Sequence, residues 1–214
     1  MGGPVMAYRT ISRAALQRLP GYLTYLRSLP EGRTHVSATA VAAALSLGEI
    51  QVRKDLAAVC GEGKPKVGYP VPELTRSLEA FLGYDDLSDA VVVGTGRLGR
   101  ALLEYSGFAD YGLRLVAGFD IDDALAGHTE RGKPIFPLSR FEELCARLHT
   151  RIGILCVPAD CAQEVCDLMV RSGFEAILNF APVHLSVPAN VLLQNENIAA
   201  DLATLAKQLR QITE

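Results

Sequence analysis

The sequence has few cysteines and histidines, and none of them falls in a metal-binding pattern. The five cysteines are Cys60, Cys145, Cys156, Cys161 and Cys166. They form no CxxC pair and no Cys/His cluster with zinc spacing, so we expect no metal site. Most lie in apolar segments, which favours reduced thiols in the core. Only the closeness of Cys156, Cys161 and Cys166 leaves a redox role open.

Long apolar runs are also missing. No stretch reaches the ~18 residues that a transmembrane helix needs. The first nine residues contain no apolar core of the kind found in a signal peptide. These features predict a cytoplasmic protein that does not enter a membrane. The 214 residues are 49% hydrophobic and 21% charged, which is ordinary for a globular chain of one large or two small domains.

The charges are unevenly distributed along the chain. Residues 1–84 hold 10 Lys and Arg against 6 Asp and Glu, a net charge of +4, whereas residues 85–214 hold 11 against 18, a net charge of −7. A basic first part joined to an acidic second part suggests that any contact with nucleic acid is confined to the first part.

A glycine-rich motif follows a short apolar run in the second part. Ala90 to Val93 is typical of a strand buried on both faces. Gly94, Gly96 and Gly99 then form Gly-x-Gly-x-x-Gly, and a helical pattern continues from Ala101. Strand, tight turn and helix are the setting in which this motif binds the pyrophosphate of a dinucleotide. The alternative is a glycine-rich turn that binds nothing.

An acidic residue supports the dinucleotide hypothesis. Leu113 to Phe119 reads as the next strand, and Asp120 ends it, roughly 20 residues after the last glycine, where an acid hydrogen-bonds the adenine ribose. Because Asp120 would repel a 2′-phosphate, the sequence favours NADH and NAD⁺ over the phosphorylated forms. The residues predicted to bind the cofactor here are Gly94, Thr95, Gly96, Arg97, Leu98, Gly99 and Asp120.

Strands and helices alternate through the rest of the second part. We expect strands at 134–136, 152–157, 176–178 and 191–194, and helices at 141–148, capped by Ser139, and at 159–172. This alternation predicts a doubly wound parallel sheet, whose ligands bind at the carboxyl ends of the strands. The candidates for the nicotinamide end are Val157, Pro158, Asn179, Phe180, Ala181 and Pro182. These segments could equally be connecting turns.

The first part reads as a small helical domain. A helix is expected over 11–29, after a tail at 1–9, with a kink or a break at Pro20. Ser37 is a plausible cap for a helix over 38–45, and a turn at 46–48 leads into a helix over 49–59. Two helices joined by a short turn with glycine form the helix-turn-helix signature.

The second helix of this pair would enter the major groove of DNA. We expect Gln51, Arg53 and Lys54 to be exposed on it, whereas the core would receive Ile50, Val52, Leu56 and Val59. A basic loop over 61–69, with Lys64 and Lys66 near its tip, would form a β-hairpin wing beside the DNA. The alternative is an alanine-rich helical domain with a solvated basic face.

The segments that follow set the domain organisation. A helix over 71–82 and a linker over 83–89 place the boundary near 84–86, giving a DNA-binding domain over 1–84 and a dinucleotide-binding domain over 85–214. A closing amphipathic helix, within 196–212, carries Leu202, Leu205 and Leu209 at helical spacing. Because helix-turn-helix proteins bind palindromes as two-fold dimers, this helix is a candidate for dimer contacts.

Several motifs together resemble the Rex family of redox-sensing transcriptional repressors. They are Arg18-Leu-Pro20 with Tyr22-Leu-x-Tyr-Leu26, Gln51-Val-Arg-Lys-Asp55, Gly68-Tyr69, Gly94-Thr-Gly-Arg-Leu-Gly-Arg-Ala-Leu102, Phe119-Asp120, Cys156-Val-Pro-Ala159 with Ala162-Gln163, and Leu178-Asn-Phe-Ala-Pro-Val183. They run in the family's order over nearly the whole chain. The family's wing usually carries an arginine where this chain has lysines, and Arg97 stands where Asn is common.

The resemblance implies an α/β protein with a winged-helix domain, a Rossmann domain and a C-terminal helix exchanged between the subunits of a homodimer. It also implies repression of a palindromic double-stranded DNA operator, which NADH relieves by closing the domains. The family's Arg–Tyr–Asp network maps onto Arg18, Tyr105 and Asp201, which would report the nicotinamide charge to the DNA-binding domain. Ser37, Gln51, Arg53, Lys54, Lys64 and Lys66 are the expected DNA contacts.

Two other functions fit parts of the sequence. An NAD-dependent dehydrogenase would need an acid–base residue at the nicotinamide, and among the histidines only His184 follows a candidate loop. A nucleotide- or coenzyme-A-binding module would use the same Rossmann motif but leaves the basic helical domain unexplained. Operator binding with and without NADH distinguishes the three.

Overall fold

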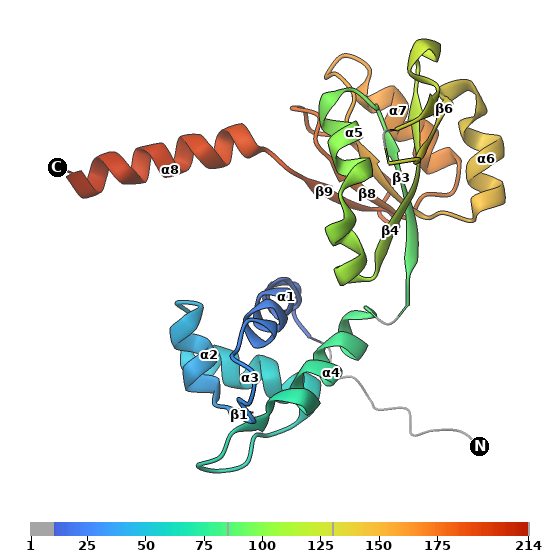
Figure 1. Ribbon diagram of the computed structural model, residues 1–214. Coiled ribbons are helices and arrows are strands. Elements are labelled where there is room, and N and C mark those ends of the chain that lie inside the picture. The colour runs from blue at the N-terminus through green and yellow to red at the C-terminus, as the bar shows by residue number, and fades with distance from the viewer. Residues whose placement is uncertain (1–10, 85, 130, 214) are drawn as a thin grey trace, which may run out of the picture. The chain divides into compact units, whose positions relative to one another are not determined.

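The computed structural model describes residues 11–84, 86–129 and 131–213, so the predicted tail over 1–9 lies outside the described residues. The chain divides into two compact units, Met1–Asp86 and Leu87–Glu214. Figure 1 shows a helical first unit and a second unit built on a sheet. Each unit has its own buried core.

The described residues of the first unit form four helices and a two-stranded sheet. The elements are α1 Arg13–Arg27, β1 His35–Val36, α2 Ala38–Ala44, α3 Glu49–Cys60, β2 Tyr69–Pro70 and α4 Val71–Leu82. Strands β1 and β2 pair antiparallel, with Val36 opposite Tyr69. All four helices contribute to one core, in which Leu19, Leu56 and Leu78 are fully buried.

Helix α1 is continuous through Pro20, so of the two predicted outcomes, a kink or a break, the break is wrong. It begins after Ser12, whose hydroxyl accepts a bond from the N–H of Ala15 at 3.2 Å. Pro20 has no N–H to donate to the preceding turn. Leu19 and Leu23, on either side of Pro20, are buried in the core, and their packing stabilises the helix at this point.

The prediction that Ile50 of α3 faces the core is wrong. It is 71% exposed, whereas Val52, Leu56 and Val59 are buried as expected. At about 100° per residue, position 50 lies roughly 200° around the helix from position 52. Ile50 therefore points away from the buried stripe. The polar residue that enters the core instead is Asp55, which is 7% exposed.

The second unit is a seven-stranded sheet with helices. Its strands are β3 Ser88–Val93, β4 Leu113–Asp120, β5 Gly127–His128, β6 Pro134–Pro137, β7 Ile152–Leu155, β8 Ala176–Asn179 and β9 Leu192–Asn195. Its α-helices are α5 Arg97–Glu104, α6 Phe141–Leu148, α7 Ala162–Arg171 and α8 Ile198–Thr213. The strand order is β5-β6-β4-β3-β7-β8-β9. Every pair is parallel except β5 with β6.

The parallel strands follow the order of a Rossmann sheet. From β3 the chain passes to β4 and β6 on one side and then to β7, β8 and β9 on the other, which is the 3-2-1-4-5-6 arrangement. Alternate residues of β3 face opposite layers. Val91 and Val93 share a core with residues of α6 and α7, whereas Ala90 and Val92 share one with Leu103 of α5. The predicted doubly wound α/β class is confirmed.

Three local predictions in this unit need correction. Ser139 is not the cap of α6, because the 3-10 helix Leu138–Arg140 runs directly into α6 and Arg140 takes the cap position. Helix α7 begins at Ala162, since a turn over 159–161 follows Pro158. The segment between β4 and β6, for which we expected no strand, contains the short strand β5, which pairs with β6.

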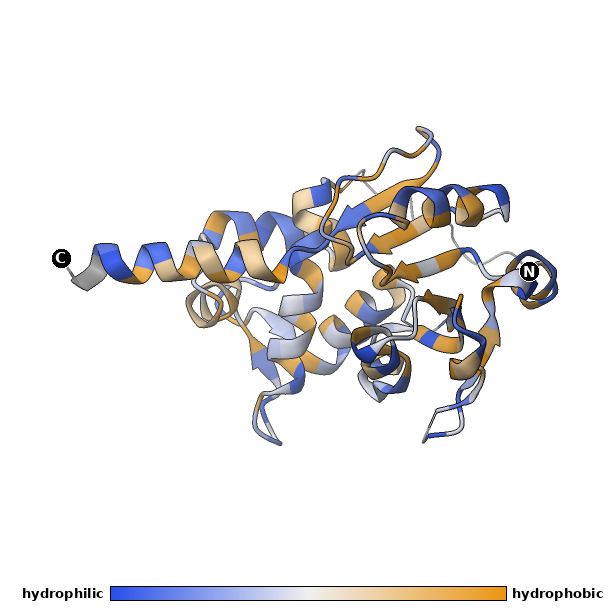
Figure 2. Cartoon of the chain, turned by 90° about the horizontal axis from the view of Figure 1, so that it is seen from above, coloured by the Kyte–Doolittle hydropathy of each residue, from blue (hydrophilic) through white to orange (hydrophobic). Residues whose placement is uncertain are grey.

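Helix α8 presents apolar side chains on its exposed surface. Ile198, Leu202, Leu205 and Leu209 are each more than half exposed. Figure 2 shows apolar and polar residues alternating along this helix toward the C-terminus, in contrast to the mostly apolar strands. Among the residues that the structure describes, no helix has the length and apolarity to cross a bilayer.

Candidate nucleic-acid interface and dinucleotide site

The turn after β3 requires glycine at position 94. Gly94 has φ +88°, a left-handed conformation that favours glycine. A Cβ there would lie 2.6 Å from the carbonyl oxygen of Cys156 and 2.9 Å from Cγ1 of Val157. The turn is therefore packed against the segment that follows β7, and this packing leaves no room for a side chain at position 94.

The second and third glycines have different surroundings. A Cβ on Gly96 would meet nothing within 4 Å, whereas a Cβ on Gly99 would collide with the carbonyl oxygen of Gly94. Gly99 thus lets α5 pack on the turn, and Gly96, the N-terminal cap of α5, borders open space. Open space at a helix N-terminus is where an anion such as a pyrophosphate can approach, since free N–H groups there bind anions. Arg97 and Leu98, the first residues of α5, are exposed beside it.

Asp120 at the end of β4 is held against this turn. Its Oδ2 accepts bonds from the N–H of Thr95 at 2.5 Å and from the Thr95 hydroxyl at 3.1 Å. Its Oδ1 accepts a bond from the N–H of Asp122 at 3.0 Å. The structure therefore brings the predicted acid and the glycine-rich turn together. These three bonds occupy three of the roughly four lone-pair sites of the carboxylate, which leaves one on Oδ1 for a ribose hydroxyl.

The order in which the chain adds strands reverses between β3 and β7, and a ligand crevice is expected at this point of a doubly wound sheet. Strand β3 pairs with β7 up to Val93 opposite Leu155, so the turn at Gly94 and the segment at Val157 leave the same edge. Val157 is partly exposed and Pro158 is exposed there. These two predicted cofactor residues therefore lie beside the glycine-rich turn.

The side chain of Asn179 is held by hydrogen bonds to its own loop and to β9. Its side chain is fully buried; Nδ2 donates to the carbonyl oxygen of Val183 at 2.9 Å and to Oδ1 of Asn195 at 2.8 Å. Its Oδ1 accepts from the N–H of Ala181 at 2.9 Å. Asn179 therefore shapes the loop that carries Phe180, Ala181 and Pro182. Of these three, only Pro182 is exposed.

Ile121 is a candidate cofactor residue that the sequence reasoning missed. It follows Asp120 directly and is 84% exposed. An exposed aliphatic side chain next to the ribose-binding acid offers an apolar surface for an adenine ring. The signal was available in the sequence, as an isoleucine within the otherwise polar segment Asp120–Asp123.

In the first unit, the helix-turn-helix is present. The hydroxyl of Ser37 accepts a bond from the N–H of Ala40 at 3.1 Å and caps α2, as predicted. The turn closes through the N–H of Leu47, which donates to Ala42 at 2.9 Å, and α3 follows from Glu49. Gln51, Arg53 and Lys54 are exposed on α3, as expected.

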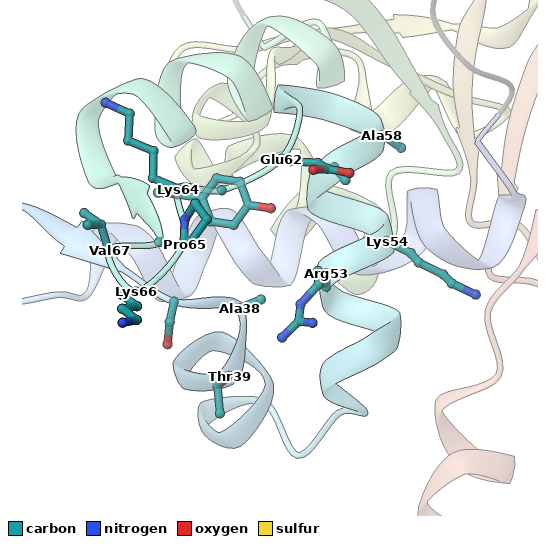
Figure 3. A pocket seen from close by; sticks show the side chains of 15 residues that line it. Ala38, Thr39, Arg53, Lys54, Ala58, Glu62, Lys64, Pro65, Lys66 and Val67 are labelled. Atoms are coloured by element: carbon teal, nitrogen blue, oxygen red, sulfur yellow. The ribbon is translucent and has the colours of Figure 1, made fainter.

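A hollow of about 900 Å³ lies between α3 and the loop before β2. It is lined by the predicted DNA contacts Ser37, Arg53, Lys54, Lys64 and Lys66, together with Thr39, Glu62 and Tyr69 among others. Figure 3 shows Arg53 and Lys54 on the helix and Lys64, Pro65 and Lys66 on the loop. Four cations against one carboxylate make the hollow positive, which suits a phosphate backbone.

The predicted wing is a tight turn. The N–H of Gly68 donates to the carbonyl oxygen of Lys64 at 2.8 Å, and the N–H of Lys64 donates back to Gly68 at 3.0 Å. Gly68 has φ +85°, and a Cβ on it would collide with the carbonyl of Val36 in β1. Lys64 and Lys66 are exposed on this turn. On α3, Arg53 forms an ion pair with Glu49, which restrains its guanidinium.

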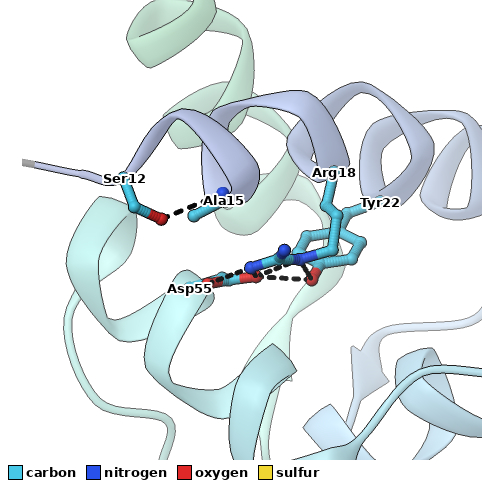
Figure 4. Close-up of polar contacts among 5 residues, drawn as sticks. All are labelled: Ser12, Ala15, Arg18, Tyr22 and Asp55. Carbon is cyan, nitrogen blue, oxygen red and sulfur yellow. Dashed lines mark hydrogen bonds and ion pairs between the residues drawn. The ribbon is translucent and has the colours of Figure 1, made fainter.

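A buried polar cluster joins α1 to α3, and the sequence reasoning missed it. Arg18 donates from Nε to Asp55 Oδ2 at 2.9 Å and from Nη2 to Oδ1 at 3.0 Å. The hydroxyl of Tyr22 donates to the same Oδ2 at 2.7 Å. Figure 4 shows the three side chains converging between the two helices. Burial and the hydrogen bond to Asp55 raise the pKa of Tyr22 to about 12, so its hydroxyl stays a donor at neutral pH.

The predicted switch residues lie in separate surroundings. Arg18 is bonded to Asp55 and Tyr22 within the first unit. Tyr105, at the end of α5, is 60% exposed and contacts Phe108 edge to face with ring centroids 5.3 Å apart. Asp201 is exposed in the first turn of α8. The network therefore remains a prediction.

The thiols are poor nucleophiles. All five cysteines are free. Burial raises the pKa of Cys60 and Cys145 to about 11 and that of Cys156 to about 12, and it also raises the pKa of Cys161 and Cys166. A raised pKa keeps a cysteine in the unreactive thiol form. The residues described by the structure contain no group of three or more metal-ligating side chains.

The two units match separate family models. Residues 85–183 match the CoA binding domain, and residues 10–57 match the family described as "Putative DNA-binding protein N-terminus". The first match covers strands β3 to β8 of the sheet, with the glycine-rich turn after β3, and the second covers most of the helix-turn-helix.

Relatives match over nearly the whole chain. A redox-sensing transcriptional repressor Rex of Porphyromonas gingivalis is 38% identical over 203 residues, covering 94% of this chain and 93% of the relative. Its counterpart from Bacteroides fragilis is 37% identical over 200 residues, covering 93% and 91%.

Solved structures show the same fold. RSP, a Rex-family repressor, in complex with β-NAD⁺ and operator DNA, is 34% identical with a TM-score of 0.88, covering 96% of this chain and 95% of that one. RSP in complex with β-NADH is 33% identical with a TM-score of 0.84, covering 96% and 97%. The chain belongs to the Rex family of redox-sensing transcriptional repressors.

Proposed function

We propose that this protein is a transcriptional repressor that senses the ratio of NADH to NAD⁺. The first unit binds a double-stranded DNA operator, and the second binds the dinucleotide. NADH binding releases the operator, whereas NAD⁺ binding leaves it bound. The two ligand types have counterparts in the RSP complexes with β-NAD⁺ and operator DNA and with β-NADH.

The observation that carries the proposal is the hydrogen bond between Asp120 and the glycine-rich turn. The same chain also has a positively charged hollow beside its helix-turn-helix. The carboxylate at the end of β4 would bind the adenine ribose and reject a 2′-phosphate. The N-terminus of α5, with open space at Gly96, would receive the pyrophosphate. Val157, Pro158 and the loop shaped by Asn179 would border the nicotinamide.

On the DNA side, α3 would lie in the major groove. Arg53 and Lys54 on α3 and Lys64 and Lys66 on the wing would contact phosphates or base edges, with Ser37 beside them. A palindromic operator requires two copies of this unit related by a two-fold axis. The protein would therefore act as a homodimer, with the exposed leucines of α8 contributing to the subunit contact by exchange.

The coupling between the sites has a thermodynamic bound. A ligand shifts an equilibrium only by its differential affinity for the two states. A coupling of about 1–3 kcal/mol would change operator affinity roughly 5- to 150-fold, and operator DNA would weaken NADH binding by the same factor. Arg18, Tyr105 and Asp201 are the residues we propose to carry this coupling.

The alternatives fit less of the chain. The relatives matched over nearly its whole length are repressors by name, and a dehydrogenase would leave the cationic hollow of the first unit without a use. A coenzyme-A-binding module would be consistent with the family model over 85–183 but not with the match over 10–57. A repressor of bacterial operators works in the cytoplasm, where we place this protein.

The test is operator binding by the full-length chain at fixed salt, because phosphate contacts make affinity depend on salt. A palindromic duplex obtained by in vitro selection is titrated with the protein, alone and with saturating NADH or NAD⁺. The proposal requires release by NADH alone. Binding of DNA that ignores both nucleotides would leave a regulator with another effector.

A further inference from the structure

The amide of Gln51 is held by the polar cluster between α1 and α3. With its Oε1 turned toward Arg18, Gln51 accepts bonds from Nη1 at 2.9 Å and from Nη2 at 3.1 Å. The opposite orientation would set the NH₂ group of Gln51 against the NH₂ groups of a guanidinium, which has donors only. The hydrogen bonds therefore select one of the two amide orientations.

Arg18 is itself fixed. Its guanidinium makes a two-point contact with Asp55, at 2.9 Å from Nε and 3.0 Å from Nη2, and Asp55 is 7% exposed. Tyr22, which is fully buried, donates a third bond to Asp55 at 2.7 Å. A planar guanidinium held at two points has little freedom to rotate. The nitrogens that face Gln51 are therefore fixed before any ligand binds.

The position of Gln51 makes its amide orientation matter. It lies in the first turn of α3 and is exposed, whereas Asp55, which anchors Arg18 and lies one turn later on α3, is buried. The N-terminal residues of a recognition helix are the ones that contact base edges. A free glutamine can present either a donor or an acceptor to a base, but Gln51 has its oxygen occupied, which leaves the NH₂ group for a ligand.

We infer that Arg18, anchored by Asp55, fixes Gln51 as a hydrogen-bond donor, so that Gln51 reads an acceptor on a base edge of the operator. This inference rests on the proposed DNA-binding function. In the major groove the acceptors are N7 of either purine, O6 of guanine and O4 of thymine, whereas cytosine presents a donor. Gln51 thus favours an acceptor at one position of each half-site and rejects cytosine there. Arg18 is a positioning residue for this contact.

The test uses the full-length protein and a duplex selected on it in vitro. Each major-groove acceptor is deleted in turn, with 7-deazapurines for N7, 2-aminopurine for guanine O6 and 5-methylpyrimidin-2-one for thymine O4. At one position per half-site the wild-type protein should lose roughly 5- to 50-fold in affinity, because an NH₂ group is left unpaired.

The variant that decides the matter is Gln51→Glu. A carboxylate keeps both bonds to Arg18 but has no NH₂ group, so Gln51→Glu should fold normally and bind the native duplex more weakly. When the acceptor at that position is deleted from the duplex, Gln51→Glu should lose no further affinity. It should prefer cytosine at that position, since a carboxylate accepts from N4 of cytosine. Gln17→Glu, exposed on α1, adds the same charge and should retain the wild-type pattern.

Arg18→Lys tests the positioning role. A single ammonium cannot hold both Asp55 and Gln51 in this planar arrangement, so the amide can turn and the discrimination against cytosine should shrink while DNA is still bound. The inference is overturned if wild-type protein is insensitive to every acceptor deletion, or if Gln51→Glu retains the wild-type sensitivity. If no duplex can be selected at all, the proposed function fails and this inference fails with it.

Discussion

Asp120 accepts a hydrogen bond from the backbone N–H of Thr95, which ties the acid at the end of β4 to the glycine-rich turn after β3. A second bond from the Thr95 hydroxyl fixes the same oxygen. The carboxylate is therefore oriented by the protein rather than by the cofactor.

Asp120→Asn should weaken NADH binding by about 10- to 100-fold, because hydrogen bonds to a charged group contribute about 1.5–3 kcal/mol. It should also reduce discrimination against NADPH, since the charge that repels a 2′-phosphate is gone. Isothermal titration with both nucleotides measures the two effects. Asp123→Asn, which removes an exposed carboxylate nearby, is the control and should leave both affinities unchanged. An unaltered preference in Asp120→Asn would contradict the assigned role.

Gly96→Ala should separate stability from binding. A Cβ at position 96 meets nothing within 4 Å, and the backbone there has φ −63°, which alanine adopts readily. We expect thermal stability close to wild type and a loss of NADH binding of at least tenfold, because the Cβ enters the space proposed for the pyrophosphate. Gly94→Ala, which meets the Cys156 carbonyl, should instead lower stability. Normal NADH affinity in Gly96→Ala would place the pyrophosphate elsewhere.

Stability should fall as pH rises from about 9 to about 12. The pKa of Cys156 is raised by burial to about 12, and that of Tyr22 is raised to about 12. The unfolded chain would ionise at the ordinary pKa values of these groups, near 9 and 10, so it releases protons first. A raised pKa contributes stability below the unfolded value and loses it as pH approaches the folded value. Urea unfolding at pH 7, 9 and 10 measures this decline, and Cys156→Ala should make it shallower.

Lys64→Gln should lower DNA affinity equally for all sequences and reduce the slope of log affinity against log salt by about 0.9, the value for one phosphate contact. Anisotropy titrations over a range of salt concentrations provide the slope. Arg171→Gln removes an exposed cation from α7 in the second unit and should leave the slope unchanged. An unchanged slope in Lys64→Gln would exclude the wing lysine from the phosphate contacts.

Ile50→Ala should reduce operator affinity roughly fourfold, because we expect the exposed isoleucine to contact the methyl group of a thymine and one buried methylene contributes about 0.8 kcal/mol. Replacing thymines one at a time by deoxyuridine should reproduce that loss at one position for wild-type protein but not for Ile50→Ala. Leu16→Ala, exposed on α1, serves as the control. Equal sensitivity of Ile50→Ala and wild-type protein to every replacement would contradict the contact.

Much of the fold was predictable because its signals are local. The run Ala90–Val93, the glycines after it and Asp120 define strand, turn, helix and strand within one short segment. Ser37 before an alanine-rich stretch likewise marks the start of α2. These features depend on residues close together in sequence, where periodicity and capping preferences apply.

The errors arose where distant residues decide the outcome. Asp55 looks like an exposed charge on an amphipathic helix, but Arg18, 37 residues earlier, makes it a buried anchor. Asn179 was predicted only from its place at the end of a strand, and its bond to Asn195, 16 residues later, adds a supporting role for the loop, while its contact with the cofactor stays a prediction. Ile50 is an exception with a local cause: its exposure follows from helix geometry, and the prediction failed because isoleucine usually belongs to the core.

The most direct test of nucleotide-controlled repression is the anisotropy of a labelled operator bound to the full-length protein, at fixed salt, as NADH is added in the presence of NAD⁺. NADH should release the duplex at ratios where NAD⁺ alone does not, and Gly96→Ala should hold the duplex throughout. An operator that stays bound at saturating NADH, with NADH binding verified separately, would contradict the redox-sensing function.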